Sequence, residues 1–277
     1  MVYIYTVLSA VILLVLNGFF GIFRESYSWW LVPLLFVGII LVFIILQMAV
    51  FGLMILCTNV KKERKSASHF FRFMVKISLP IIVAVARVKI NAKGIEKLPA
   101  NTLAMFVCNH QHDFDPAVML ALFPDAKLAF IGKKEIYTTM PFVAKAMHKL
   151  DCMPIDREND RAAALTIIKA IKTIKEGRAS IGIFPEGYVS KSCELLPFRN
   201  GCFKIAIKAQ VPIAVCVINN TREVPKNIFR RKTVIEFRLL DVIYPEQFEG
   251  MNTAEIGEIV HKKMEEGLEE IRSVKEK

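Results

Sequence analysis

A histidine and an aspartate stand five residues apart in the stretch 108–116, Cys-Asn-His-Gln-His-Asp-Phe-Asp-Pro. His110 can act as a general base if a carboxylate holds one ring nitrogen protonated and leaves the other free to accept a proton. Asp115 is the candidate for that carboxylate. The apolar run 102–107 predicts a buried strand before the motif, and Pro116 suits the first turn of a following helix. The sequence therefore predicts both side chains on one strand-to-helix turn.

Two later stretches end apolar runs in groups that can bind a substrate. The first is Ile155-Asp156-Arg157, whose planar guanidinium can bind phosphate with paired donors. The second brings Glu186 and Gly187 to the end of the strand predicted at 180–184, where glycine lets a substrate approach the backbone. Open α/β sheets bind ligands at the carboxyl ends of their strands. A surface Asp-Arg pair and a tight turn are the alternative readings of these residues.

The part of the chain from residue 88 onward alternates between strand-like and helix-like patterns, which predicts an α/β domain with a mixed sheet flanked by helices. The predicted strands are 88–92, 102–107, 127–131, 180–184, 211–217 and 233–242. The predicted helices are 117–123, a longer stretch from 132 towards 149, 161–175, 205–210 and a charged tail helix from 253 to 277. We expect this tail helix to be solvated and to lie against the edge of the domain.

The composition of the first sixty residues indicates contact with lipid, whereas that of the rest of the chain indicates contact with water. The first sixty residues contain only two charged side chains, Arg24 and Glu25. Residues 1–23 and 29–57 are each long enough to cross a bilayer core as a helix, which takes about 20 residues. We expect a membrane hairpin connected by residues 24–28, with two buried or monotopic helices as the alternative. The basic cluster 61–65 then predicts a cytoplasmic side for everything that follows.

Four segments follow from these patterns: a two-helix membrane anchor at 1–60, a basic and amphipathic connector at 61–92, a catalytic domain at 93–250 and the charged helix at 251–277. The connector includes an apolar stretch with interspersed cations and Pro80, which is expected to kink or end a helix. The sequence leaves open whether this stretch lies on the membrane or packs on the sheet.

The formal net charge of +11 belongs almost entirely to the region after residue 60 and suits anionic partners such as phospholipid headgroups or a phosphorylated acyl carrier. The apolar front end and the lack of a basic-aromatic array argue against nucleic acid. The six cysteines form no CxxC pair, so we expect reduced, buried thiols.

Four short blocks together resemble the glycerolipid acyltransferases, the family of 1-acylglycerol-3-phosphate acyltransferases, over residues 88–217. They are the NHxxxxD motif with His110 and Asp115, then Ile155-Asp156-Arg157, Phe184-Pro185-Glu186-Gly187 and Val211-Pro212-Ile213. The resemblance implies a membrane-bound O-acyltransferase whose fold is that of the family. It needs no metal or cofactor and transfers an acyl group from acyl-CoA or acyl-acyl carrier protein to a lysophospholipid. The expected acceptor is 1-acylglycerol 3-phosphate, which gives phosphatidic acid.

By the same resemblance His110 is the base, Asp115 its orienting partner and Arg157 a phosphate ligand, while Glu186 and Gly187 form part of the acceptor pocket. The chain departs from the family where Thr-Arg-Ser often follows the glycine of the third block. Here the sequence is Tyr188-Val189-Ser190, so the usual arginine is missing. A second cation for the phosphate can come from one of three residues: Lys191, Arg199 or Lys204. Another lysophospholipid or polar acceptor is therefore an open alternative.

Two other classes of protein are alternative interpretations of these residues. A metallohydrolase can begin with His110-x-His112, but Phe114 and Asp115 occupy the positions where the HxHxDH metal pattern needs Asp and His. A non-catalytic, membrane-anchored lipid-binding protein accounts for the apolar front end without assigning chemistry to His110. A serine hydrolase lacks its GxSxG sequence motif.

Overall fold

The computed structural model describes residues 2–21, 30–60, 67–190, 192–228 and 230–273. The predicted connection at 24–28, the basic cluster at 61–65 and Lys191 lie outside these ranges. The chain divides into two compact units, residues 1–57 and residues 58–277. The predicted division into four segments stays a prediction.

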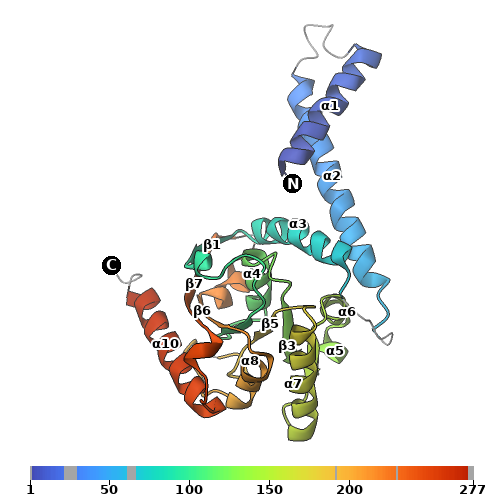
Figure 1. Ribbon diagram of the computed structural model, residues 1–277. Helices are drawn as coiled ribbons and strands as arrows, with labels where there is room; N and C mark the ends of the chain where they lie inside the picture. Colours follow the sequence, from blue (N-terminus) through green and yellow to red (C-terminus); the bar gives the residue numbers. More distant parts are fainter. Residues whose placement is uncertain (1, 22–29, 61–66, 191, 229, 274–277) are drawn as a thin grey trace. The chain divides into compact units, whose positions relative to one another are not determined.

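The first unit is a pair of helices, α1 (Val2–Phe20) and α2 (Leu31–Leu56), shown in Figure 1. The helices pack against each other through the stacked rings of Tyr5 and Phe43, and the Tyr5 hydroxyl donates a hydrogen bond to Gln47. Among the described residues, α2 is the one helix long and apolar enough to cross a membrane, and the apolar part of α1 is shorter. The two predicted helices are therefore present, while their crossing of a bilayer stays a prediction.

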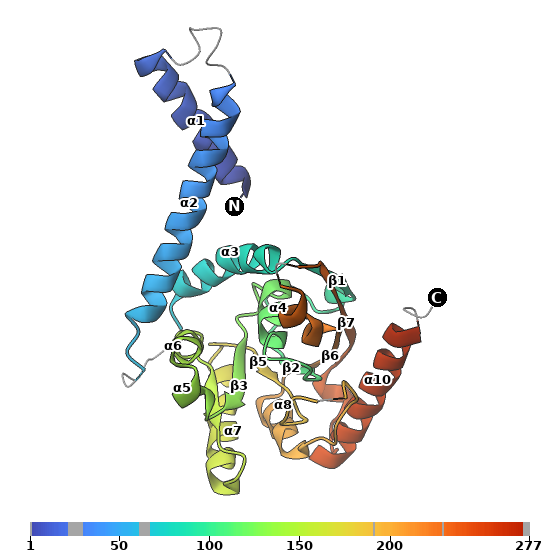
Figure 2. The ribbon, with the colours of Figure 1, turned by 180° about the vertical axis from the view of Figure 1, so that it is seen from behind.

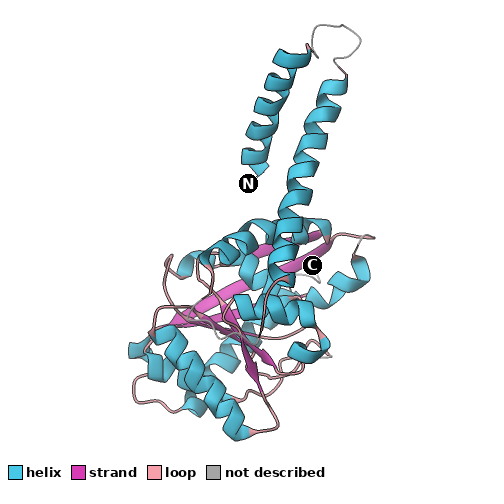
Figure 3. Ribbon diagram, turned by 90° about the vertical axis from the view of Figure 1, so that its right-hand side faces the viewer, coloured by secondary structure: helices cyan, strands magenta, loops and turns pink. Residues whose placement is uncertain are grey.

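The second unit contains a seven-stranded sheet in the order β1-β7-β6-β2-β5-β3-β4. Its strands are β1 (Val88–Lys93), β2 (Met105–Cys108), β3 (Ala129–Lys133), β4 (Met153–Ile155), β5 (Ile181–Ile183), β6 (Ile213–Asn219) and β7 (Thr233–Ile243). Neighbouring strands are parallel except for the antiparallel pair β6 and β7. The predicted mixed sheet is confirmed (Figure 3).

Helices cover both faces of this sheet, as Figures 1 and 2 show from opposite sides. The helices of this unit are α3 (His69–Val85), α4 (Asp115–Leu122), α5 (Ile136–Thr139), α6 (Pro141–Lys149), α7 (Asp160–Lys175), α8 (Lys204–Ala209), α9 (Val224–Asn227) and α10 (Thr253–Ser273). Short 3₁₀ turns occur at Ile95–Lys97, Asn200–Phe203, Thr221–Glu223 and Pro245–Gln247.

The pleat of the strands divides the core into two clusters. Side chains alternate along β2, so Met105 and Val107 join one cluster while Phe106 and Cys108 join the other. The first cluster includes residues of α7, α8 and α10, and the second includes residues of α3 and α4. The central strands are buried on both faces, which explains why they appear in the sequence as continuous apolar runs.

The helix expected from 132 towards 149 is wrong in its extent. Residues 129–133 form β3, and two helices, α5 and α6, follow with a break between them at Met140. The break comes from Pro141, because the residue before a proline is disfavoured in the helical region. Met140 accordingly has φ −130° and ψ 69°.

The expectation of a solvated tail helix is wrong, because one face of α10 is part of the core. Its buried side chains include Ile256, Val260, Met264, Leu268 and Ile271, which recur every three or four residues and so lie on one face. The many charged residues of this helix occupy its remaining faces. The sequence pattern therefore predicts a solvated helix.

The segment α3, whose placement the sequence left open, packs on α4 and β1. Ser68 caps its first turn by accepting a hydrogen bond from the backbone N–H of Phe71. Arg72 donates to the carbonyl oxygens of Leu128 and Leu150. Packing on the domain is thus observed, and contact of the outer face of α3 with a membrane stays a prediction.

Candidate active site

The predicted site residues gather at the carboxyl ends of three parallel strands. His110 follows β2, Arg157 follows β4, and Glu186 and Gly187 follow β5. β2 is hydrogen-bonded to β5, β5 to β3 and β3 to β4. This edge of an open α/β sheet is where ligands bind, because the chain leaves each strand there and its loops converge.

His110 and Asp115 form the predicted pair. The imidazole Nδ1 lies 2.8 Å from Asp115 Oδ2, and the aspartate side chain is fully buried while that of the histidine is 13% exposed. An ionised carboxylate can only accept hydrogen bonds, so this contact places the ring proton on Nδ1. The lone pair of Nε2 is then available to accept a proton, and none of the described residues hydrogen-bonds to that atom.

The carboxylate of Asp115 is held by the turn that it begins. Its Oδ2 also accepts hydrogen bonds from the backbone N–H groups of Gln111 and His112, at 2.7 and 2.9 Å. These bonds close the loop between β2 and α4, so the five-residue spacing of the motif is the length of one tight turn. The orientation of the imidazole is therefore fixed by the backbone.

Asn109 anchors this turn to the neighbouring strand. Its side-chain amide donates to the carbonyl oxygen of Ile218 and accepts from the Ile218 N–H, at 2.9 and 2.8 Å. Such a pair replaces the ladder hydrogen bonds that β2 loses where it turns away from β6. The role of Asn109 cannot be recognised from the sequence, because its partner lies 109 residues further along the chain.

The ring of Phe184 covers one face of the histidine. The two ring centroids are 4.2 Å apart with an interplanar angle of 18°, and Phe184 in turn stacks on Phe130 at 6.0 Å. These contacts restrict rotation of the imidazole about its Cβ–Cγ bond. Sequence reasoning noted Phe184 only as the start of the third block.

Glu186 lies beneath the histidine, 3% exposed. Its two oxygens accept hydrogen bonds from the backbone N–H groups of His110 and Leu196, at 2.7 and 2.9 Å. Burial raises the pKa of this carboxyl group, and the two backbone donors partly oppose that shift. Glu186 therefore braces the loops that follow β2 and β5. Its contact with an acceptor stays a prediction.

Two guanidinium groups lie over the Tyr188 ring. The Arg157 Cζ atom is 5.2 Å and the Arg199 Cζ atom 5.5 Å from the ring centroid. Arg199 also donates to the Arg157 carbonyl oxygen at 3.2 Å and to the Tyr188 hydroxyl at 3.3 Å. Arg199 thus brings a second cation to Arg157 in a chain that lacks the arginine usual at position 189.

Gly187 makes this arrangement possible. Its φ of +76° lies in the left-handed region, and a Cβ atom there would be 3.2 Å from Arg199 Nε. The surface pair between Asp156 and Arg157, which the sequence left as an alternative, is not formed, because Asp156 binds Lys134 at 2.6 Å. The hydrogen bond from Lys134 lowers the pKa of Asp156.

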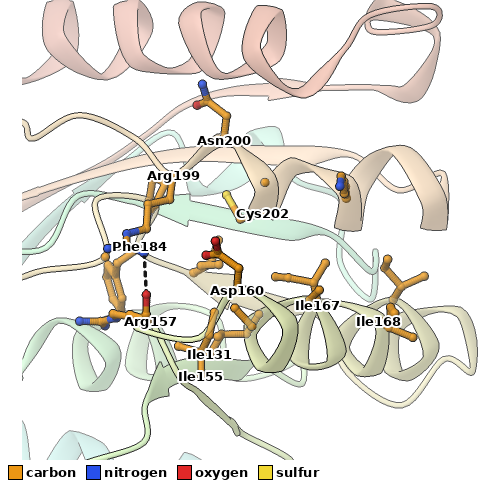
Figure 4. Close-up of a pocket in the computed structure, with 18 of the residues that line it drawn as sticks. Ile131, Ile155, Arg157, Asp160, Ile167, Ile168, Phe184, Arg199, Asn200 and Cys202 are labelled. Carbon is orange, nitrogen blue, oxygen red and sulfur yellow. Dashed lines mark hydrogen bonds between the residues drawn. The ribbon is translucent and has the colours of Figure 1, made fainter.

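A cavity of about 680 Å³ opens beside these residues. Four of the predicted substrate-binding residues line it: Arg157, Gly187, Arg199 and Lys204. Figure 4 shows Arg157, Phe184 and Arg199 together at one end, with isoleucines along the rest. Glu186 is outside this lining, and Lys191 lies in the part of the chain that the structure does not describe.

The first histidines of the rejected metal pattern are engaged elsewhere. His110 Nδ1 contacts Asp115, and His112 Nδ1 accepts a hydrogen bond from the backbone N–H of Phe114 at 3.1 Å. Within the described ranges, no three His, Cys, Asp or Glu side chains are placed to hold a metal ion together. That the protein works without a metal stays a prediction.

Comparisons with known proteins agree with this geometry. Residues 89–219 match the acyltransferase family. The 1-acyl-sn-glycerol-3-phosphate acyltransferase of Salmonella typhimurium is 36% identical over 133 residues, which are 48% of this chain and 54% of that protein. The enzyme of the same name from Saccharomyces cerevisiae is 28% identical over 225 residues, 78% of this chain and 71% of that protein. The chain thus spans about half the length of the Salmonella relative.

Among solved structures, the fold is similar to the crystal structure of the 1-acyl-sn-glycerophosphate acyltransferase PlsC from Thermotoga maritima. The TM-score is 0.58 at 20% sequence identity, and the match covers 98% of both chains. The family match contains all four motif blocks, so the expected resemblance to the 1-acylglycerol-3-phosphate acyltransferases is confirmed.

Proposed function

We propose that the protein transfers a fatty acyl group from an acyl thioester to the free hydroxyl of a lysophospholipid, with 1-acylglycerol 3-phosphate as acceptor and phosphatidic acid as product. The observation that carries this proposal is the oriented His110–Asp115 pair, whose Nδ1···Oδ2 distance is 2.8 Å. The ring of Phe184 connects this pair to a cavity that two arginines border.

In this reaction Nε2 of His110 removes the proton from the acceptor hydroxyl as its oxygen forms a bond to the thioester carbonyl carbon. The carbon–sulfur bond then breaks, and the proton on Nε2 passes to the departing thiolate. Asp115 stabilises the imidazolium that exists between these two proton transfers. General base help of this kind contributes about 10²–10⁴-fold, so positioning of the two substrates must supply much of the remaining acceleration.

The acceptor's phosphate is assigned to Arg157 and Arg199. Both guanidiniums contact the ring of Tyr188 and so present several donors to one region, which suits a phosphate monoester. Lys204 borders the same cavity and can add a third positive charge. These cations support the lysophosphatidate assignment even though Val189 replaces the usual arginine.

The donor is acyl-CoA or acyl-acyl carrier protein, and the net charge of +11 suits both. The apolar helices α1 and α2 support membrane attachment, with the catalytic unit on the cytoplasmic side as the sequence predicts. An acceptor that already lies in a bilayer is consistent with such an anchor.

Replacement of His110 by Ala tests whether this histidine is the base in acyl transfer. We expect transfer of a labelled acyl group to lysophosphatidate to fall by about 10²-fold or more, because no base remains at the hydroxyl. His112→Ala is the matched control two residues away and keeps most of the activity. Lysolipid binding that persists in His110→Ala without transfer supports the proposal. An unchanged transfer rate in His110→Ala would leave a non-catalytic lipid-binding protein as the better account.

A panel of lysolipids tests the acceptor. Purified protein is incubated with a labelled acyl donor and acceptors that carry a phosphate monoester, a phosphodiester headgroup or no phosphate. We expect the monoester to be preferred, and Arg199→Ala to raise its KM more than it lowers kcat. Transfer only to acceptors without the monoester contradicts the lysophosphatidate assignment and leaves the general reaction intact.

A further inference from the structure

The helix α3 carries apolar side chains on two opposite faces. Phe71, Met74 and Leu79 are buried against the sheet unit. On the opposite side Phe70 and Phe73 are 56% and 48% exposed, and their rings stack with centroids 6.5 Å apart. A helix that is apolar all round is normally covered on every side. The exposed side of α3 therefore calls for an apolar partner.

This exposed side, here named the outer strip, runs the length of the helix. Its residues recur every three or four positions and are exposed or half-buried: Phe70, Phe73, Ile77, Pro80, Ile81 and Ala84. The helix has 17 residues, so at 1.5 Å per residue the strip is about 25 Å long. Continuous apolar surface of this extent on a folded unit marks a site of interaction with another apolar body.

Four cations gather where the outer strip ends. Arg87 follows α3 directly and is exposed, and the run 230–232, Arg-Arg-Lys, is exposed as well. The backbone holds the two segments together: the N–H of Thr233 donates to the carbonyl oxygen of Arg87 at 3.0 Å, and Val88 pairs with Thr233 in the sheet. Figure 1 shows β1 beside the end of α3. Arg87 and residues 230–232 are named the basic corner.

The charge of the basic corner is not neutralised by neighbouring side chains. Neither α3 nor β1 contains an acidic residue, and the stretch 224–235 contains none. In the described parts of the chain, none of the four cations forms a salt bridge. Ile228, in the same loop, is 38% exposed. The surface thus combines apolar side chains with free positive charge.

This combination selects among the possible partners. A basic surface alone suits an acidic protein, and an apolar strip alone suits a protein groove. Apolar side chains next to cations suit the surface of an anionic bilayer, where the former enter the boundary of the acyl chains and the latter contact lipid phosphates. The observations therefore favour lipid.

The basic corner lies on the edge of the sheet that carries the candidate active site. Its loop starts at the end of β6, and β7 begins at that same edge because it is antiparallel to β6. Gln111, next to His110, donates to Asn219 Oδ1 at 3.2 Å and accepts from the N–H of Asn220 at 2.9 Å. A bilayer that binds the corner is therefore near this edge.

We propose that the outer strip of α3 and the basic corner together bind the surface of a bilayer leaflet that contains anionic phospholipid. The strip enters the headgroup region and the cations bind lipid phosphates. All residues of this surface belong to the unit 58–277, so the contact is separate from any made by α1 and α2. It needs no acyl transfer and does not depend on the proposed function.

One substitution removes apolar surface from the strip. Phe73→Ser keeps the fold, because the Phe73 side chain is half exposed and lies outside both hydrophobic clusters. Leu165→Ser is the matched control, since Leu165 is a 62% exposed apolar residue on α7.

A second substitution reverses the charge of the corner. The variant is Arg230→Glu/Arg231→Glu/Lys232→Glu. The matched control changes the charge by the same amount at three exposed lysines of α7, as Lys169→Glu/Lys172→Glu/Lys175→Glu. Comparison of the two separates the position of the charge from the net charge of the protein.

Photolabelling by lipid measures the contact without an activity assay. The full chain is placed in nanodiscs of phosphatidylcholine, with or without phosphatidylglycerol, that contain a phospholipid with a diazirine close to its glycerol. After irradiation the adducts are mapped by mass spectrometry. We expect adducts within residues 69–85, with a yield about fivefold or more higher when phosphatidylglycerol is present, the ratio that the attraction of one cation gives.

The variants give the decisive comparison. Phe73→Ser should lower the yield in both kinds of nanodisc, and reversal of the corner should remove the effect of phosphatidylglycerol, while the two α7 controls keep the wild-type pattern. Adducts confined to residues 1–57, or equal yields with and without phosphatidylglycerol, overturn the proposal.

An acidic protein is the other candidate partner. Acyl carrier protein is crosslinked to the full chain with a carbodiimide, which joins its carboxylates to lysines such as Lys232. Crosslinks that reversal of the corner abolishes, together with unchanged lipid adducts, assign the corner to an acidic protein and overturn the proposal. Crosslinks that the reversal leaves in place, together with lost lipid adducts, support it.

Discussion

At the residue scale, the proposed chemistry depends on one carboxylate oxygen with three hydrogen-bond donors. Asp115 Oδ2 accepts from His110 Nδ1 and from two backbone N–H groups, while its Oδ1 is buried with no partner in the described parts of the chain. The negative charge of the Asp115 carboxylate stabilises the imidazolium. The shape of the turn, in contrast, needs only a hydrogen-bond acceptor at this position. These two contributions can be separated by a substitution that keeps the shape.

Asp115→Asn keeps one oxygen for the backbone donors and removes the charge. We expect kcat to fall by about 10²–10⁴-fold, because the imidazolium loses its counter-ion and the ring can adopt the other tautomer. The KM for the acceptor changes little, since Asp115 is buried and away from the substrate. Steady-state kinetics check this, with the exposed Asp113→Asn as the control. Near wild-type kcat in Asp115→Asn contradicts the assigned role.

Glu186 predicts a dependence of stability on pH. Burial raises its pKa above the usual 4.5, so the folded protein keeps this proton in a range where the unfolded chain has lost it. As pH rises from 4.5 through the raised pKa, the free energy of unfolding therefore falls. Glu186→Gln cannot titrate. Thermal unfolding of both proteins between pH 4.5 and neutral pH should show the wild type losing stability relative to the variant. Parallel profiles contradict the prediction.

At the scale of elements, a sheet edge collects residues that are far apart in the sequence. Strands β2, β5 and β4 each deliver one motif to the same edge, and their parallel direction is what makes the carboxyl ends coincide. The only antiparallel pair in the described sheet, β6 with β7, lies on the other side of β2. The antiparallel pair therefore lies apart from the parallel strands β5, β3 and β4, and the carboxyl ends that carry the candidate site still coincide.

The helix α10 stabilises this sheet although its sequence is highly charged. Met264 is fully buried in the cluster that also contains residues of β6. Met264→Ala should lower the free energy of unfolding by about 2–5 kcal/mol, because it removes apolar contacts and leaves a cavity. Glu265→Ala, one position along on the exposed side, is the control and should change it by about 0.5 kcal/mol or less. Chemical denaturation measures both. Equal stabilities of the two variants argue against a structural role for the helix.

At the scale of the whole molecule, the sheet unit has a hydrophobic interior of its own. Both hydrophobic clusters of the sheet are formed entirely by residues beyond position 80. The sheet unit therefore has the core that independent folding requires. The apolar helices α1 and α2 contribute a surface of a different kind, suited to lipid.

A chain shortened to residues 58–277 should consequently fold. We expect a single cooperative thermal transition with the His110–Asp115 pair retained, because no core residue of the sheet is removed. Membrane association in flotation experiments should weaken relative to the full chain. Broad, non-cooperative unfolding of the shortened chain contradicts this prediction, and the full chain in detergent is the reference.

The sequence by itself determined the local features of this protein. It located His110 and Asp115 on one turn, because a strand, a tight loop and a proline-initiated helix follow each other within a few residues. It also placed Arg157 and Gly187 after strands, and the order of its four blocks indicated the resemblance to the acyltransferases. Patterns of this kind are short-range, so they can be read along the chain.

Only the tertiary structure decided the contacts that join distant segments. Three such contacts depend on which loops the sheet brings together. They are the hydrogen bonds of Asn109 with Ile218, the hydrogen bond from the His110 backbone to Glu186, and the stacking of Arg199 on Tyr188. The burial of α10 was hidden for the same reason. Charge on one face of a helix says nothing of what the opposite face packs against, and that partner is supplied by strands elsewhere in the chain.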